Sequence, residues 1–209
     1  ARLANRVDAV CVEVLDGLGA SPGGDAVRHV REALHEPLRV AIVGRIKAGK
    51  STLLNALLRE RIAPTDAGEC TRHVCWYRHG HGYAVGARLV DGRHVALPFH
   101  RGETSVEIDL SAAPGPVEAL DVAWPSGALS RLTLIDTPGT GSSDEAVRLR
   151  AAAFLYGESG VAPEADAVVY LMRHLHRTDM ELLESLYAES IASTSPVNAV
   201  AVLSRADEI

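Results

Sequence analysis

The fold is decided by residues 40–58, which read VAIVGRIKAGKSTLLNALL. A short continuous apolar run, Val40 to Val43, comes first and is typical of a strand buried on both faces. Residues 44–51 then match the pattern G-x-x-x-x-G-K-[ST], and regularly spaced leucines follow, as in a helix. Strand, glycine-bounded loop and helix, in this order, are the context in which that pattern forms a phosphate-binding loop.

This loop predicts a nucleotide site with stated roles for two side chains. Backbone N–H groups freed by the glycines, together with the positive end of the following helix, attract phosphate oxygens. The amino group of Lys50 is expected to bridge the β- and γ-phosphates, and the hydroxyl of Ser51 is expected to bind Mg²⁺. The loop residues that we expect to contact the nucleotide are Gly44, Arg45, Ile46, Lys47, Ala48, Gly49, Lys50, Ser51 and Thr52.

Beyond this loop, similar apolar runs typical of buried strands recur at 132–135, 167–171 and 199–203, with helical patterns at 144–156 and 178–191. Alternation of strands and helices predicts an α/β fold with a doubly wound, mostly parallel sheet. Residues 73–129 differ, because short alternating segments and turn signals predict antiparallel strands inserted at the sheet's edge.

The N-terminal part is expected to be helical. Apolar residues spaced by threes and fours over 2–19 predict an amphipathic helix, and Ser21-Pro22-Gly23-Gly24 ends it. A second short helix is expected from Asp25, as N-cap, to the residues before Pro37. We therefore divide the chain into a helical segment, 1–36, and an α/β domain, 37–209.

Further site residues are expected where the later strands end, since ligands of doubly wound sheets bind there. Asp136 begins the sequence Asp-Thr-Pro-Gly and is expected to reach the metal through a water, while the N–H of Gly139 is expected to face the γ-phosphate. In the polar loop 64–72 we choose Thr71 over Thr65 as the residue that binds Mg²⁺ and holds the attacking water, because Thr71 adjoins the next strand.

The last strand is followed by Ser204-Arg205-Ala206-Asp207, a variant of the N/T-K-x-D sequence that selects guanine. Asp207 is expected to accept hydrogen bonds from base groups that adenine lacks. Arg205, in place of the usual lysine, can lay its stem and guanidinium over the base.

These motifs, in this order, resemble those of bacterial dynamin-like GTPases. Within that family, they are similar to the actinobacterial isoniazid-inducible protein C type and the related septum dynamin type. The resemblance rests on four sequence segments: 49-GKSTLLNAL-57, 63-APTDAGECTR-72, 136-DTPGT-140 and 204-SRADE-208.

The resemblance implies a P-loop domain with a dynamin-type insertion, preceded by helices of a neck bundle. It implies Mg²⁺-dependent GTP hydrolysis, stimulated when two G domains pair and coupled to membrane remodelling. The paired domains can be two copies of this chain or this chain and a paralogous dynamin-like protein. Some relatives carry an arginine finger in the phosphate loop, so we expect Lys47 to supply catalytic positive charge in cis. Because the sequence stops soon after Asp207, we expect a G domain truncated at its C-terminal end, with membrane contact made by parts absent from this chain.

Composition limits the alternatives. The 209 residues carry 21 basic and 27 acidic side chains, a net charge of −6, which argues against binding to nucleic acid or to anionic lipid through overall charge. Three cysteines favour a reducing compartment and thus a cytoplasmic protein, and without an apolar run of transmembrane length only peripheral membrane contact remains open. The resemblance implies that the full-length protein is peripherally membrane-associated. The alternatives kept open are a nucleotide-binding assembly partner with little turnover, an RNA- or ribosome-associated GTPase, and an ATPase.

Overall fold

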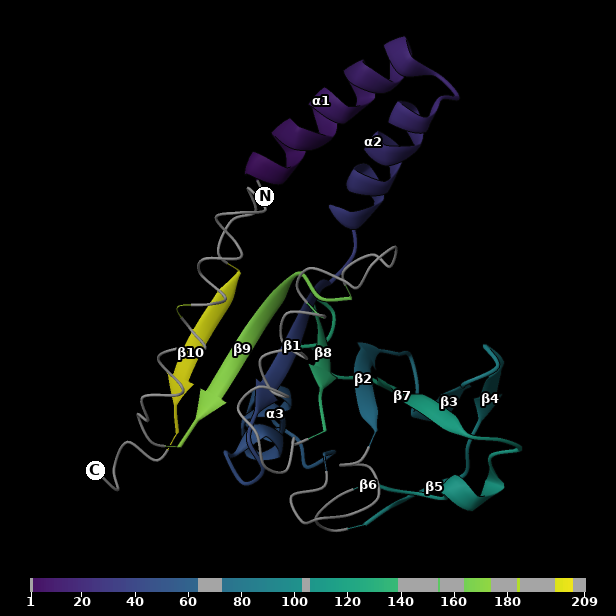
Figure 1. Cartoon of the computed structure of the whole chain (residues 1–209), viewed down its shortest axis with the longest axis vertical. Helices are drawn as coiled ribbons and strands as arrows, with labels where there is room; N and C mark the ends of the chain where they lie inside the picture. The colour runs from purple at the N-terminus through teal and green to yellow at the C-terminus, as the bar shows by residue number, and fades with distance from the viewer. Residues whose placement is uncertain are drawn as a thin grey trace. The chain divides into compact units, whose positions relative to one another are not determined.

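The computed structural model describes residues 2–63, 73–102, 106–138, 154, 164–173, 184 and 198–204. Contacts divide the chain into two compact units, Ala1–Pro37 and Leu38–Ile209. Figure 1 labels the helices and strands of both units.

The first unit is a hairpin of α1 (Arg2–Leu18) and α2 (Pro22–Ala33). The second helix starts earlier than the sequence indicated. Its N-cap is Ser21, whose hydroxyl oxygen accepts the N–H of Gly24 at 3.1 Å, and Asp25 lies inside the first turn. The expected cap at Asp25 was therefore wrong, because a serine followed by proline is itself a strong helix start.

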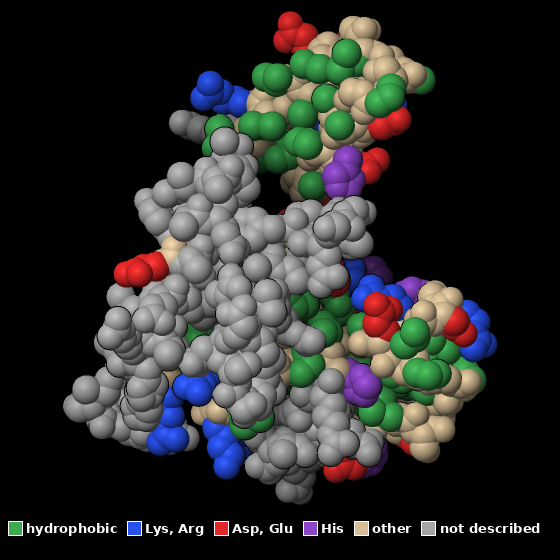
Figure 2. Space-filling model, in the orientation of Figure 1, with side chains coloured by type: hydrophobic (Ala, Val, Ile, Leu, Met, Phe, Trp, Pro, Cys, Tyr) green, Lys and Arg blue, Asp and Glu red, His purple; other side chains and the backbone are tan. Residues whose placement is uncertain are grey.

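An ion pair and an exposed apolar surface characterise this hairpin. The carboxylate of Asp8 on α1 accepts a hydrogen bond from the guanidinium of Arg31 on α2 at 2.8 Å. Figure 2 shows hydrophobic side chains gathered on the outer surface of the two helices. The exposed members include Leu3, Val10, Val12, Val14, Leu18 and Val30.

The second unit is built on an eight-stranded sheet with the order β10-β9-β1-β8-β2-β7-β3-β4 (Figure 1). Its strands are β1 (Leu38–Gly44), β2 (Val74–His79), β3 (Ala84–Leu89), β4 (His94–Ala96), β7 (Val117–Trp124), β8 (Leu132–Asp136), β9 (Ala167–Met172) and β10 (Ala199–Leu203). Two further short strands, β5 (Phe99–Arg101) and β6 (Val106–Ile108), pair with each other. The helices are α3 (Lys50–Leu58) and a 3₁₀ turn, η2 (Leu110–Ala112).

The direction of the strands separates the sheet into two halves. β10, β9, β1 and β8 all run parallel, as the buried apolar runs predicted. β2 then pairs antiparallel with β8, and β3 pairs antiparallel with β7 and with β4. One expectation was too simple, since β2 and β7 of the insertion pair in parallel. The chain crosses over between them through β3 to β6, and alternation of side chains does not encode strand direction.

Apolar cores lie on both faces of the sheet. One cluster includes Leu54 of α3, Trp124 of β7 and Leu134 of β8, and the other includes Val43 of β1 and Tyr170 of β9. Burial on both faces is what the parallel half of a doubly wound sheet requires.

A salt bridge with an additional backbone hydrogen bond holds the start of the first strand. The guanidinium of Arg39 donates to both carboxylate oxygens of Asp166, at 2.7 and 3.2 Å, and its backbone N–H donates to Oδ2 at 2.8 Å. This salt bridge lies at the start of β1, whereas the phosphate-binding pattern begins where β1 ends.

Candidate functional site

The phosphate loop lies where the sequence placed it, between the end of β1 at Gly44 and the start of α3 at Lys50. A Cβ on Gly44 would come within 2.3 Å of the carbonyl oxygen of Leu171 on β9, so only glycine allows this approach. Gly49 caps α3 in a left-handed conformation, φ +95°, which other residues rarely adopt. Both glycines of the motif are thus required, Gly44 by the close approach of β9 and Gly49 by its backbone conformation at the N-terminus of α3.

The amino group of Lys50 lies inside this loop. Its side chain is buried, and Nζ donates hydrogen bonds to the carbonyl oxygens of Gly44 at 2.9 Å and Arg45 at 3.0 Å. Burial lowers the pKa of Lys50, and the negative charge of Asp136 partly offsets that effect. A cation held among carbonyl oxygens at a helix N-terminus can bind an anion by exchanging these contacts for phosphate oxygens.

Asp136 supplies the opposite charge at the end of β8. The residue is 9% exposed, and burial raises the pKa of its carboxyl to about 6 against the opposing effects of Lys50 and the N–H of Thr137. Oδ1 is buried and has no hydrogen-bond partner among the described residues. A buried carboxylate with an unsatisfied oxygen is unfavourable unless a cation or a donor reaches it, so this atom is a candidate ligand.

Thr137 fixes the backbone directly after Asp136. Its hydroxyl donates to the carbonyl oxygen of Ile42 on β1 at 3.0 Å, and the side chain is 3% exposed. Sequence reasoning assigned no role to this threonine, although its place in the Asp-Thr-Pro-Gly sequence was a signal. The bond holds the start of the segment that carries Gly139 against the strand that carries the phosphate loop.

Lys47 and Ile46 form the exposed tip of the loop. Lys47 adopts a left-handed backbone conformation, φ 63°, which is uncommon for a residue other than glycine. The side chain of Ile46 is 55% exposed, while Ala48 is buried beneath the tip. The loop therefore presents one positive charge and one apolar side chain to solvent.

Ser204 is the described part of the expected guanine-specific sequence. A Cβ on Gly49 would lie 3.9 Å from the Cβ of Ser204, so the end of β10 adjoins the phosphate loop. The hydroxyl of Ser204 donates to the carbonyl oxygen of Met172 at 3.1 Å, at the end of the neighbouring strand β9. The structure thus brings the ends of β1, β9 and β10 together.

Several expected features lie outside the described residues: Thr71 with its loop, Gly139, Arg205, Asp207, and the helices at 144–156 and 178–191 apart from single helical positions at 154 and 184. Among the expected site residues that are described, the loop 44–52 and Asp136 are brought together, and Ser204 borders the loop.

The residues present fit a magnesium site of the kind that needs a nucleotide to complete it. The unsatisfied Oδ1 of Asp136 and the hydroxyl of Ser51 are oxygen ligands of the type that Mg²⁺ prefers. No set of three or more histidine, cysteine or acidic side chains in the described ranges is arranged to hold a metal ion. In nucleotide sites, Mg²⁺ is commonly held by one or two protein ligands together with phosphates and waters.

In the part of the chain that the structure describes, no helix is long and apolar enough to cross a bilayer.

Comparison with known proteins gives a consistent assignment. The model of the dynamin family matches residues 40–202, from β1 to β10. The isoniazid-induced protein IniC of Mycobacterium tuberculosis is 42% identical over 177 residues, which cover 84% of this chain and 36% of IniC. Dynamin-like protein A of Bacillus subtilis is 29% identical over 148 residues, covering 70% of this chain and 12% of that protein.

Solved structures support the same fold. A structure of an oligomerised bacterial dynamin pair matches with a TM-score of 0.59 at 18% identity, covering 99% of this chain and 32% of that one. The chain thus spans about a third of the length of relatives such as IniC, at 36%. The family expected from the motifs is confirmed, as is the α/β fold. The chain belongs to the dynamin family, and residues 44–51, which carry the phosphate-loop pattern, lie within the segment that matches the family model.

Proposed function

We propose that this chain binds GTP and hydrolyses its γ-phosphate bond. The observation that carries the proposal is the pair formed by the buried Lys50 amino group, held by two loop carbonyls, and the buried Asp136, whose Oδ1 is unsatisfied among the described residues. Both charges are unfavourable without a ligand, and a nucleotide with its metal ion satisfies both.

Each part of the site has a role in this proposal. The loop from Gly44 to Thr52 binds the phosphates through N–H groups, and Lys50 contacts the β- and γ-phosphates. Ser204, Arg205 and Asp207 bind the base, with Asp207 selecting guanine. Thr71 positions the attacking water and Gly139 contacts the γ-phosphate. Catalysis then consists of positioning and electrostatic stabilisation, since phosphoryl transfer needs little covalent help from the protein.

Magnesium is the cofactor that these residues fit, with Ser51 and Thr71 as the side chains that would hold it and Asp136 acting through a water. Dynamin-family GTPases generally use GTP with Mg²⁺, which neutralises charge on the β- and γ-phosphate oxygens. The contribution of the chain itself is the buried, oriented carboxylate of Asp136 and the hydroxyl of Ser51 at the start of α3.

Lys47 is proposed to supply transition-state charge when a second G domain orders the loop tip. Its exposed position and left-handed backbone leave the side chain accessible at the tip. Positive charge placed where negative charge develops lowers the barrier most when water is excluded, which pairing of two nucleotide faces would achieve.

We further propose a dynamin-like activity: pairing with a second copy or with a paralogous dynamin-like protein, and peripheral action on membranes from the cytoplasm. The solved relative is an oligomerised pair described as sensing and tethering membranes, which supports this proposal by analogy of fold. Helices α1 and α2 are proposed to belong to a bundle outside the G domain, because their apolar side chains are exposed in the hairpin.

The test is GTP turnover per molecule of chain, measured with Mg²⁺ over a range of protein concentrations, with Lys50→Ala as the inactive control. Turnover that rises with concentration and is lost in Lys50→Ala supports a pairing-stimulated GTPase. Tight GTP binding with no turnover at any concentration contradicts hydrolysis and favours an assembly partner instead.

A further inference from the structure

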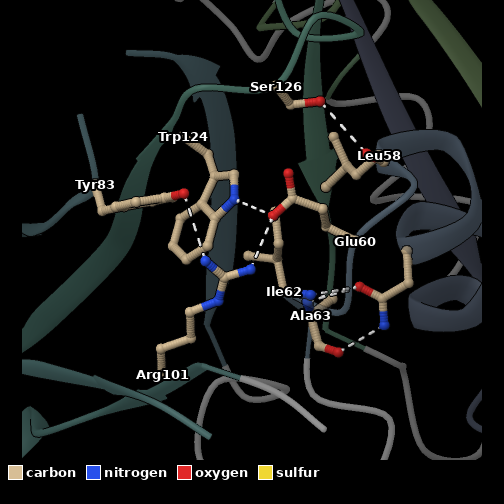
Figure 3. A network of polar contacts seen from close by, with 9 residues as sticks. Leu58, Glu60, Ile62, Ala63, Tyr83, Arg101, Trp124 and Ser126 are labelled. Atoms are coloured by element: carbon tan, nitrogen blue, oxygen red, sulfur yellow. Dashed lines mark hydrogen bonds and ion pairs between the residues drawn. The ribbon is translucent and has the colours of Figure 1, made fainter. Parts of the chain in front are cut away.

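The connection that follows α3 is held from two directions at residues 59–63 (Figure 3). From the helix side, Oδ1 of Asn55 accepts the backbone N–H groups of Ile62 at 2.9 Å and Ala63 at 2.8 Å. Nδ2 of Asn55 donates to the carbonyl oxygen of Ala63 at 2.9 Å. The carbonyl oxygen of Ile62 accepts the N–H of Val106 on β6 at 3.3 Å.

All four backbone polar groups of Ile62 and Ala63 are therefore paired, and both side chains are buried at 2% and 0% exposure. Backbone groups that are buried and fully paired do not move without losing several hydrogen bonds at once. These two residues form a fixed end point of the connection.

From the side of the inserted strands, Glu60 is held by a second set of contacts. Its Oε2 accepts the indole N–H of Trp124 on β7 at 2.8 Å and the guanidinium of Arg101 on β5 at 3.3 Å. The guanidinium carbon of Arg101 lies 5.4 Å from the ring centres of both Trp124 and Tyr83. Figure 3 shows the carboxylate pointing to the indole and the guanidinium together. Stacked and charge-assisted contacts of this kind give Glu60 one preferred position.

The placement of these contacts connects them to the phosphate loop. Asn55 lies on α3, the same nine-residue helix that begins with Lys50 at the end of the phosphate-loop pattern. The helix sets the spacing between Lys50 and Asn55, and the hydrogen bonds of Asn55 extend that fixed spacing to Ala63. The next residues, 64–72, carry Thr71, which the proposed function assigns to the attacking water.

We propose that Asn55 and Glu60 are positioning residues: they fix the point at which the chain enters residues 64–72 relative to the phosphate loop, and so set the rate of hydrolysis. This inference rests on the proposed GTPase function. Neither residue contacts the phosphate loop in the interactions described above, so their loss acts on the chemical step and leaves nucleotide binding largely intact.

The experiment compares kcat and KM for GTP, and the affinity for a non-hydrolysable GTP analogue, in the chain carrying Asn55→Ala or Glu60→Ala. Leu89→Ala is the stability control, because Leu89 is fully buried in β3 and makes none of these contacts. Glu118→Ala is the charge control for Glu60, since Glu118 pairs with Arg88 on the exposed surface. Rates are corrected for the folded fraction of each variant.

We expect Asn55→Ala to lower kcat roughly 10-fold or more, and Glu60→Ala about 3- to 10-fold, because small displacements of positioned groups carry costs of this size. Analogue affinity should stay within about 3-fold of the parent chain, since the loop itself is unchanged. If Asn55→Ala does not fold, Glu60→Ala against Glu118→Ala decides the question.

Two outcomes separate this inference from the proposed function. In the first, the parent chain hydrolyses GTP, but both variants either keep the kcat of their controls or lose analogue affinity as much as kcat. The positioning role is then wrong, while the proposed GTPase function is unaffected. If the parent chain itself shows no hydrolysis, both are wrong.

Discussion

Replacement of Asp136 by asparagine should stabilise the nucleotide-free chain and abolish its GTP turnover. Burial raises the pKa of Asp136 from 3.8 to about 6. A shift of one pKa unit corresponds to about 1.4 kcal/mol, so ionised Asp136 lowers the free energy of unfolding by about 3 kcal/mol at neutral pH. Asparagine keeps an oxygen that can accept the N–H of Thr137 and carries no charge to bury.

The direction of the pKa shift determines how the contribution of Asp136 to the free energy of unfolding changes with pH. The folded chain keeps the Asp136 proton at pH values where the unfolded chain has released it, so this group favours folding at low pH. That contribution is lost as pH rises through about 6, the pKa in the folded chain. The parent and Asp136→Asn chains should therefore differ by less than about 1 kcal/mol at pH 4 and by the full amount at pH 7.5.

Scanning calorimetry without nucleotide and with EDTA measures this difference. For a chain of this size, about 3 kcal/mol raises the melting temperature by roughly 6 to 12 °C at pH 7.5. Asp166→Asn is the matched control with the opposite sign. Burial opposes ionisation of Asp166, but the side chain and N–H of Arg39 lower its pKa overall, so this variant should melt lower at pH 7.5. A melting temperature for Asp136→Asn that is unchanged, or raised equally at both pH values, would contradict a raised pKa of Asp136 in the folded chain.

Three further predictions concern the loop and its neighbour. Lys47→Ala should reduce concentration-stimulated GTP turnover about 10-fold or more while the affinity for a GTP analogue changes little. Lys50→Ala, by contrast, should weaken nucleotide binding itself. Equal turnover in Lys47→Ala and the parent chain would exclude the proposed catalytic charge of Lys47. Gly44→Ala should destabilise the chain by about 2 kcal/mol or more in urea unfolding, because its Cβ would lie 2.3 Å from the carbonyl oxygen of Leu171; a smaller loss would mean that β9 yields easily. Thr137→Val should lower the free energy of unfolding by about 0.5 to 1.5 kcal/mol, since it removes the buried hydrogen bond from the hydroxyl to the Ile42 carbonyl oxygen. Calorimetry showing no loss would contradict a stabilising role for that bond.

The sequence predicted the parallel half of the sheet well because its strands are short, continuous apolar runs. The run 167–171 is largely buried and lies between two neighbouring strands, as such a run predicts. The loop between β1 and α3 was equally predictable, since its glycines, lysine and serine form a short contiguous pattern at 44–51. Both signals are contained within a few neighbouring residues.

Features that depend on distant partners could not be predicted in the same way. The parallel pairing of β2 with β7 depends on how the chain crosses between them, and no local pattern records it. Asn55 could be recognised as a polar residue in an apolar helix, but its partners at Ile62 and Ala63 become visible only once the turn after α3 is formed. The raised pKa of Asp136 likewise arises from burial by the whole sheet.

We infer that this site recognises a guanine nucleotide through its phosphates and base. Calorimetric titration of the chain with GDP, a non-hydrolysable GTP analogue and ADP, each with Mg²⁺, tests this inference, with Lys50→Ala as the control. We expect micromolar binding of both guanine nucleotides, much weaker binding of ADP, and loss of binding in Lys50→Ala. Equal affinity for ADP, or undiminished binding in Lys50→Ala, would contradict it.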